Sequence, residues 1–282
     1  MNVIPFQHLS CPLDGNPLQR GDRSWQCATG HCYDIARQGY THLLPVQKKK
    51  SRDPGDSKDM VAARRRFLNG NHYQPIARAV GAMVLANVPG QATVSCLDAG
   101  CGEGYYLREL AAIESEQTLA LLGLDISKWA VQAAAKQDRR ASWVVGSNAN
   151  LPVASDSLDR VLCLFGFPVY EEFARVLKQG GELIQVDAGA DHLRELREIV
   201  YPTLKPRDQT KKPVPPGFEC LARETVKFEL ALSEAQPIAD LLAMTPHLYR
   251  ASVEGRARAA ELKSLTVTVE VTLKRFGRLA RG

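Results

Sequence analysis

The sequence contains no long apolar run. Nowhere do about 18 consecutive apolar residues occur, the length that a membrane-spanning helix needs. The first eight residues, Met-Asn-Val-Ile-Pro-Phe-Gln-His, have neither a basic start nor an apolar core, so we do not expect a secretory signal peptide. The seven cysteines follow no regular disulfide framework in a chain of 282 residues. These absences favour a cytoplasmic protein with reduced thiols and no membrane partner.

The composition is that of a globular protein, with 45% hydrophobic and 24% charged residues. Its net charge of +5 is modest but unevenly placed. Between Lys48 and Arg78, nine cationic residues face three acidic ones, an excess larger than that of the whole chain. Such a concentrated positive segment favours a polyanionic partner. Its cationic residues are Lys48, Lys49, Lys50, Arg52, Lys58, Arg64, Arg65, Arg66 and Arg78.

Short apolar runs alternate with helical patterns in the middle of the chain. The strands are predicted at 94–98, 119–124, 143–145, 160–165 and 182–187, with helices at 103–113 and 127–136 after the first two. This alternation predicts an α/β fold, with a parallel sheet covered by helices on both faces. Two later segments, 224–232 and 265–274, alternate apolar and polar residues and predict an antiparallel pair at one sheet edge.

Shifts in composition divide the chain into regions. Residues 1–46 are rich in turns and hold three of the seven cysteines. Residues 47–90 carry the basic segment, where Asp56 or Ser57 is predicted to cap a helix that Gly70 ends. A Pro- and Lys-rich stretch at 205–217 predicts a loop inside the remaining part. We therefore expect a small domain at 1–46, a basic linker with helices at 47–90 and a larger domain at 91–282.

A glycine-rich turn, Asp98-Ala-Gly100-Cys-Gly102-Glu103-Gly104, follows the first of these strands. Ligands of doubly wound sheets bind at such strand ends, and glycines let the backbone approach them closely. The G-x-G-x-G spacing differs from the dinucleotide motif, and no Lys-Ser/Thr pair follows as in a phosphate-binding loop. Asp98 and Glu103 instead suit a cationic amino group. The turn thus favours S-adenosylmethionine (SAM), whose methionine end carries one.

Two further strand ends support the same ligand. Asp125 closes the second strand, where a carboxylate can accept both ribose hydroxyls. The segment 146–152, with Asn148 and Leu151, follows the third strand, where the adenine would lie. Glycines and an Asp occur at the strand ends of any parallel sheet, but the three signals in order favour SAM. With the reversed last strand, they predict a Rossmann-like class I SAM-dependent methyltransferase.

A cluster of potential metal ligands lies near the N-terminus. Cys11-x2-Asp14 and Cys27-x3-His31-Cys32 have the outline of two zinc knuckles joined by a hairpin. Asp14 stands where a cysteine would be usual. A carboxylate can bind zinc, and Cys32 could substitute for it. Alternatively, hydrogen bonds and packing hold the hairpin without a metal. The small domain is thus predicted to be zinc-ribbon-like.

Several longer runs resemble one family, the RlmA-type 23S rRNA (guanine-N1)-methyltransferases, over nearly the whole chain. The runs are Gly39-Tyr40-x2-Leu43-Leu44-Pro45-Val46-Gln47, Ser51-Arg52-Asp53-Pro54-Gly55-Asp56, Ala63-Arg64-Arg65-x-Phe67-Leu68, His72-Tyr73-Gln74-Pro75, the glycine turn with Tyr105 and Tyr106, and Met244-Thr245-Pro246. The resemblance implies an N-terminal zinc-binding domain that serves RNA recognition and a SAM domain. It also implies a homodimer with a cleft for RNA, and methylation of a guanine in a hairpin loop of 23S rRNA.

The resemblance also implies roles for single residues. Tyr73 and His192 would contact SAM together with Gly102 and Glu103. The zinc ligands would be Cys11, Asp14, Cys27 and His31, with Asp14 departing from the cysteine of the family.

Methyl transfer from a sulfonium is an in-line displacement, so holding the acceptor in place supplies most of the gain. Guanine N1 must also lose a proton, and Asp187 at the end of the fifth strand is a candidate base, unless it only orients a loop. Phe165 and Phe167, after the fourth strand, are candidates to stack on a splayed-out guanine. One of the two is expected to pack inside instead.

The basic segment is predicted to contact RNA phosphates. Arg64 to Arg66 are consecutive on a helix and cannot all meet one RNA strand, so at least one should lie elsewhere. Two other functions remain open: a small-molecule methyltransferase, which seldom carries a ribbon and basic linker, and a SAM-binding RNA-interacting protein without catalysis. The latter would not need an open pocket at 165–168. The predicted RNA contacts are Lys48, Lys49, Lys50, Arg52, Arg64 and Arg65.

Overall fold

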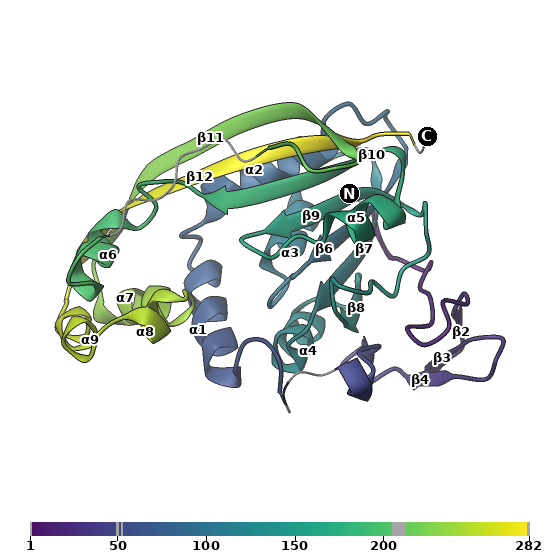
Figure 1. The fold of residues 1–282 in the computed structure, drawn as a ribbon, viewed down its shortest axis with the longest axis horizontal. Helices are drawn as coiled ribbons and strands as arrows, with labels where there is room; N and C mark the ends of the chain where they lie inside the picture. Colours follow the sequence, from purple (N-terminus) through teal and green to yellow (C-terminus); the bar gives the residue numbers. More distant parts are fainter. Residues whose placement is uncertain (1, 49–50, 52, 205–212, 281–282) are drawn as a thin grey trace.

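The computed structural model describes residues 2–48, 51, 53–204 and 213–280. At its centre is a nine-stranded sheet in the order β11-β12-β10-β9-β6-β7-β8-β5, with β1 paired to β7 outside this path (Figure 1). The parallel core runs through β10, β9, β6, β7 and β8, which confirms the five predicted strands. These strands span Leu177–Ala188, Leu158–Leu164, Thr93–Ala99, Thr118–Asp125 and Ser142–Val145, respectively.

The core strands are mainly apolar and buried over most of their length because both faces of the sheet are covered. One face packs against α2 (Gln74–Leu85), α3 (Tyr105–Ala112) and α4 (Lys128–Gln137). On the other face lie α5 (Tyr170–Val176) and the N-terminal segment with Phe6 and Leu9. The helices predicted after the first two strands are therefore confirmed as α3 and α4.

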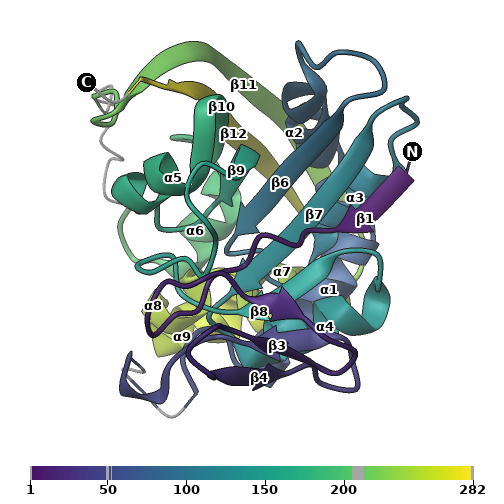
Figure 2. The ribbon, with the colours of Figure 1, turned by 90° about the vertical axis from the view of Figure 1, so that its right-hand side faces the viewer.

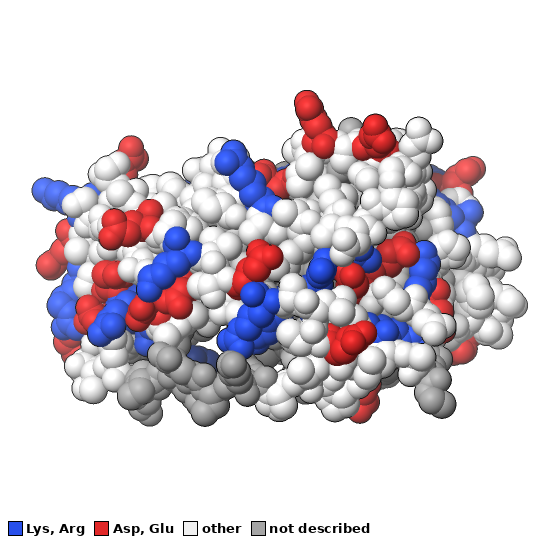
Figure 3. Space-filling view, turned by 90° about the horizontal axis from the view of Figure 1, so that it is seen from above, with Lys and Arg blue, Asp and Glu red and all other residues white. Residues whose placement is uncertain are grey.

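Two long strands close one edge of the sheet. β12 (Leu265–Arg278) runs antiparallel to β10, and β11 (Phe218–Leu232) runs antiparallel to β12. The predicted antiparallel pair is thus confirmed. Figure 3, seen from above in the view of Figure 1, shows positive and negative side chains interspersed on this side of the molecule. Of the loop predicted at 205–217, residues 205–212 lie outside the described residues.

Residues 2–46 contribute to two sheets. β1 (Asn2–Pro5) and β5 (Tyr40–His42) extend the main sheet by pairing with β7 and β8. The ribbon is a separate antiparallel sheet of β2 (Gln19–Arg20), β3 (Ser24–Gln26) and β4 (Cys32–Asp34), placed close to β8 (Figure 2). The N-terminal region is therefore anchored in the main sheet, beyond what the sequence predicts.

A short 3₁₀ turn, η1 (Val46–Lys48), precedes the linker helix α1 (Lys58–Asn69). Ser57 caps α1 by accepting from the N–H of Met60, and Gly70 ends it, as predicted. Four helices form a cap beyond the sheet: α6 (Arg194–Val200), α7 (Ala235–Ala243), α8 (His247–Arg250) and α9 (Val253–Ala260). Arg66 of α1 binds the buried carboxylate of Asp240 in α7 with two hydrogen bonds of 3.0 and 2.6 Å. None of the described helices is long and apolar enough to cross a membrane.

Candidate functional site

A cavity of about 1060 Å³ lies at the carboxyl ends of β6, β7, β8 and β9. This is the position at which parallel α/β sheets bind ligands. The α1 linker and the start of α8 form its other walls. The cavity brings together ten residues that the sequence predicts for the cofactor or the reaction, and also Arg64, a predicted RNA contact. The ten are Tyr73, Gly100, Gly102, Glu103, Asp125, Asn148, Phe165, Phe167, Asp187 and His192.

The glycine turn has the conformation that only glycine adopts easily. Gly100, Gly102 and Gly104 have φ angles of +103°, +55° and +84°. A Cβ on Gly104 would lie 2.6 Å from a ring carbon of Trp143, so this position also lacks space. Asp125 fixes the turn by accepting from the N–H of Gly102 at 2.9 Å. Gly104 is not part of the cavity wall, but it shapes the turn whose residues Gly100 to Glu103 line the cavity.

Asp98, the first residue of this glycine segment, lies near the end of β6, is 1% exposed and does not form part of the cavity wall. Neither of its carboxylate oxygens has a hydrogen-bond partner among the described residues. Burial, and then the charge of Asp125, raise the pKa of Asp98 to about 8. Buried polar groups in proteins are nearly always paired, because an unpaired one costs free energy. A ligand that donates hydrogen bonds here would therefore be stabilised.

Three tyrosine hydroxyl groups share this condition. The Oη atoms of Tyr73, Tyr105 and Tyr106 are buried and have no hydrogen-bond partner in the described part of the chain. Burial, then Tyr73, Tyr105 and Asp98, raise the pKa of Tyr106 well above its usual value. All three tyrosines line the cavity. The sequence analysis names Tyr106 in the run after the glycine turn but does not predict it as a site residue.

Glu103, for which the sequence predicts a SAM contact, lines the cavity and already has partners within the protein. Its carboxylate binds Arg108 of α3 at 3.0 Å and Gln137 of α4 at 2.5 Å. Burial raises the pKa of Glu103, and the Arg108 charge opposes that shift. The side chain is thus committed to joining the two helices behind the turn. Asp98 remains as the unpaired acidic group.

An aromatic wall lines the cavity opposite the turn. Phe165 stacks on His192, with ring centres 5.9 Å apart and planes at 27°, and Tyr73 lies 6.3 Å from Phe165. Phe165 has a φ of +55°, a strained conformation for a bulky residue. His192 accepts from the N–H of Glu270 at 3.3 Å. Phe165 is 41% exposed and Phe167 is 90% exposed, so the expectation that one of the two packs inside is wrong.

Asp187, the candidate base, lies in the cavity wall at the end of β10. Its Oδ2 accepts from Lys274 Nζ at 2.8 Å and from Gln185 Nε2 at 2.9 Å. These two donors fix the orientation of the carboxylate. It can therefore present a defined acceptor to a molecule in the cavity.

The segment after β8 is divided between the cavity and the core. Asn148 lines the cavity, and its Nδ2 donates to the carbonyl of Ala99 at 3.3 Å. Its Oδ1 is buried and lacks a partner among the described residues. Leu151 is 2% exposed and does not line the cavity. Residues 146–150 can thus meet a ligand, and Asn148 offers it an unpaired side-chain oxygen.

The three consecutive arginines of α1 point to three different surroundings. Arg64, for which the sequence predicts an RNA contact, instead pairs with Asp56 and donates to the carbonyl of Met244 at 3.0 Å. It closes the cavity between linker and cap. Arg65 is exposed, and Arg66 binds Asp240. Of the other predicted RNA contacts, Lys49, Lys50, Arg52 and the side chain of Lys48 lie outside the described residues.

Four potential metal ligands converge in the ribbon. The ligand atoms of Cys11, Asp14, Cys27 and His31 all lie within 4.8 Å of one another. His31 Nδ1 is 3.5 and 3.4 Å from the two sulfurs and 3.1 Å from Asp14 Oδ2. Ligands around a tetrahedral zinc ion are about 3.3–3.8 Å apart, given bonds of roughly 2.0–2.3 Å. The residues therefore fit zinc, and Cys32 is exposed and outside the cluster.

Two family models match the chain. The model described as "RlmA, N-terminal" covers residues 9–52, and a methyltransferase-domain model covers residues 96–181. The biotin biosynthesis bifunctional protein BioHC of Cellvibrio japonicus is 34% identical over 43% of this chain and 25% of its own length. Among solved structures, the Bacillus YcgJ protein has 18% identity and a TM-score of 0.43, covering 72% of this chain and all of its own. That likeness adds nothing to the assignment.

A relative that matches the whole chain decides the family. The 23S rRNA (guanine(748)-N(1))-methyltransferase of Streptomyces fradiae is 32% identical over 278 residues, which are 96% of this chain and 96% of that protein. The match thus includes the ribbon, the linker, the sheet and the cap. The chain belongs to the family of RlmA-type 23S rRNA (guanine-N1)-methyltransferases.

Proposed function

We propose that the chain transfers the methyl group of SAM to N1 of a guanine in a hairpin loop of 23S rRNA. The observation that carries the proposal is the match, over 96% of both chains, to a 23S rRNA (guanine(748)-N(1))-methyltransferase. The cavity supports it, because seven of the ten residues predicted to contact SAM line one space.

SAM fits the polar groups of the cavity. Its cationic amino group would meet the unpaired carboxylate of Asp98 and the hydroxyl groups of Tyr73 and Tyr106. Asp125 offers its remaining lone pairs to the ribose, and Asn148 meets the adenine. When bound, SAM supplies an electrophilic methyl group.

The chain contributes position and proton transfer. Phe165, held on His192, and the exposed Phe167 form a place for a splayed-out guanine beside the cavity. Asp187, oriented by Lys274, accepts the N1 proton as the new bond forms. Catalysis then rests mainly on holding the guanine nitrogen in line with the methyl group.

The ribbon has a structural role in this proposal. Cys11, Asp14, Cys27 and His31 hold one zinc ion that fixes the hairpin, far in sequence from the residues of the large cavity. Residues 1–46 act in RNA recognition, residues 47–90 form the basic linker, and residues 91–282 form the methyltransferase domain. The enzyme acts in the cytoplasm, where ribosomal RNA is made and assembled, as a homodimer.

The test is transfer of a labelled methyl group from SAM to unmodified 23S rRNA, with reverse transcription to map the product. A methyl group on N1 blocks the Watson–Crick edge, so we expect one stop, next to a loop guanine. Label transferred to a small molecule of a cell extract, and not to RNA, would contradict the proposal. So would SAM and RNA binding without transfer, which would favour a non-catalytic protein.

A further inference from the structure

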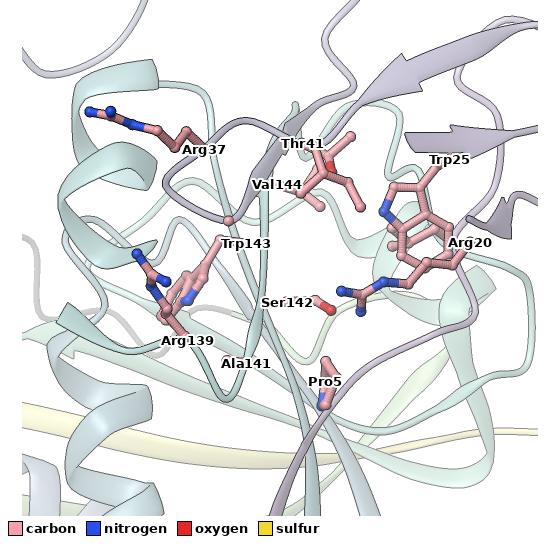
Figure 4. A pocket seen from close by; sticks show the side chains of 13 residues that line it. Pro5, Arg20, Trp25, Arg37, Thr41, Arg139, Ala141, Ser142, Trp143 and Val144 are labelled. Atoms are coloured by element: carbon pink, nitrogen blue, oxygen red, sulfur yellow. The ribbon is translucent and has the colours of Figure 1, made fainter. Parts of the chain in front are cut away.

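A second, smaller pocket of about 220 Å³ lies between the ribbon and the β5–β8 edge of the main sheet. Strands β2 and β3, the segment before β5 and the turn before β8 form it. Figure 4 shows Arg20 and Trp25 on one side and Arg37 and Arg139 on the other, with Ser142 between. The pocket thus joins three segments that are distant in sequence.

The lining is strongly cationic. It contains three arginines and no acidic residue. Arg20, Arg37 and Arg139 are all exposed, and none forms an ion pair with another described residue. The nearby carboxylate of Asp138 is bound by Arg140 at 2.7 Å instead. Three uncompensated cations around one small space create a positive potential that an anion would relieve.

The side chains that line this pocket suit a phosphate group better than a nucleic-acid base. Arg20 lies over the ring of Trp25 at 5.8 Å, and Trp25 is only 3% exposed, so no base can stack on that ring. The Ser142 hydroxyl donates to the carbonyl of Phe6 at 2.8 Å and is already used. Guanidinium groups remain, and their paired donors match phosphate oxygens.

The pocket also lies within reach of the RNA. It includes residues 141–144 of the segment that leads through β8, and the same segment continues at Gly146 into the large cavity. Five residues of strand span about 16 Å, a distance that an RNA hairpin readily covers. The side of the molecule around β11 and β12, by contrast, mixes both charge signs (Figure 3).

We propose that this three-arginine pocket binds backbone phosphates of the RNA substrate, outside the loop that is methylated. The proposal rests on the proposed function, since that supplies the RNA. Because phosphates carry no sequence information, the pocket sets affinity and register but not the choice of base.

The test compares the triple variant Arg20→Gln, Arg37→Gln, Arg139→Gln with Arg223→Gln, an exposed arginine on β11 at the opposite edge. Affinity for 23S rRNA is measured at several salt concentrations, with unfolding temperature as a check of folding. The triple variant should bind about tenfold more weakly, and its salt dependence should fall by about 2 to 3 units of log-log slope. SAM affinity and the mapped nucleotide should not change.

Unchanged RNA affinity and slope in the folded triple variant, with wild-type methylation intact, would overturn the pocket alone. An equal loss of RNA affinity in the Arg223→Gln control would also overturn it, because the effect would then come from the overall charge of the protein. Inorganic phosphate at matched ionic strength should weaken RNA binding by the wild type more than by the triple variant, because it competes for the pocket; equal weakening in both proteins would contradict the proposal. Failure of the wild type to methylate RNA would instead contradict the proposed function.

Discussion

The large cavity and the zinc cluster are two polar sites built in opposite ways. The cavity collects residues from positions 51 to 250, and several of its buried oxygens have no partner in the described part of the chain. The cluster comes from positions 11 to 31, and its ligand atoms already contact one another. The cavity therefore offers buried oxygens that a ligand with hydrogen-bond donors can satisfy. In the cluster, by contrast, the four potential metal ligands contact one another.

The largest effect should come from Gly104→Ala in the glycine turn. The new Cβ would meet Trp143 at 2.6 Å in a backbone with φ +84°, so we expect a loss of about 2–4 kcal/mol of stability. SAM binding by calorimetry should disappear. The matched change in the ribbon, Gly30→Ala, has φ +90° but open space, and should cost only about 1–2 kcal/mol. Equal losses in the two variants would contradict the tight packing of the turn.

Asp98→Asn should come next. Removing this carboxylate, which has no partner among the residues that the structure describes, should weaken SAM binding about 10- to 100-fold. With the pKa of Asp98 near 8, wild-type SAM affinity should rise as the pH increases from 6 to 8, because the ionised form binds the amino group. Calorimetry over this range should give a flat profile for the variant. Asp187→Asn, whose carboxylate is paired with Lys274, should keep the wild-type profile.

The same pKa predicts how the ligand-free protein responds to pH. The pKa of Asp98 is raised in the folded state. As the pH rises above about 4, the Asp98 carboxyl group therefore loses its proton first in the unfolded chain. The free energy of unfolding should therefore fall between pH 4 and 8 and then level off. In Asp98→Asn this part of the decline should be absent in denaturant titrations. An identical decline in both proteins would assign it to other groups.

Asp14→Ala should affect the metal and leave SAM alone. Loss of one of four ligands should lower bound zinc from one ion per chain to a small fraction, by metal analysis after dialysis. Asp14→Cys should retain the metal. SAM affinity should stay within about twofold of wild type in both variants, because the cavity is built from other residues. Equal zinc contents in all three proteins would exclude Asp14 as a ligand.

Tyr106→Phe should produce the smallest effect, and it should raise the stability of the free protein instead of lowering it. Removing an unpaired buried hydroxyl should raise the stability of the free protein by about 1 kcal/mol while weakening SAM binding a few-fold. Tyr170→Phe is the matched control: its hydroxyl donates to Gln185 at 3.0 Å, so this variant should lose about 1 kcal/mol. Destabilisation of Tyr106→Phe would mean that its hydroxyl has a partner.

The sequence predicts the fold well because the strands and turn carry local signals. Apolar runs locate the five core strands, and the helix cap at Ser57 follows from its side chain. The choice of partner for a charged side chain has no such local signal. Glu103 pairs with Arg108 and Arg64 with Asp56, and neither pair is predicted from the sequence although its members lie close together in it. Tyr106 is found only once the burial of its hydroxyl is known.

The most direct test of the central claim is a crystal structure with S-adenosylhomocysteine, the product of SAM. We expect its amino group to bind Asp98 and Tyr106, its ribose to lie on Asp125, and its sulfur to face Phe165. A product bound elsewhere, with Asp98 still unpaired beneath an empty turn, would contradict the account.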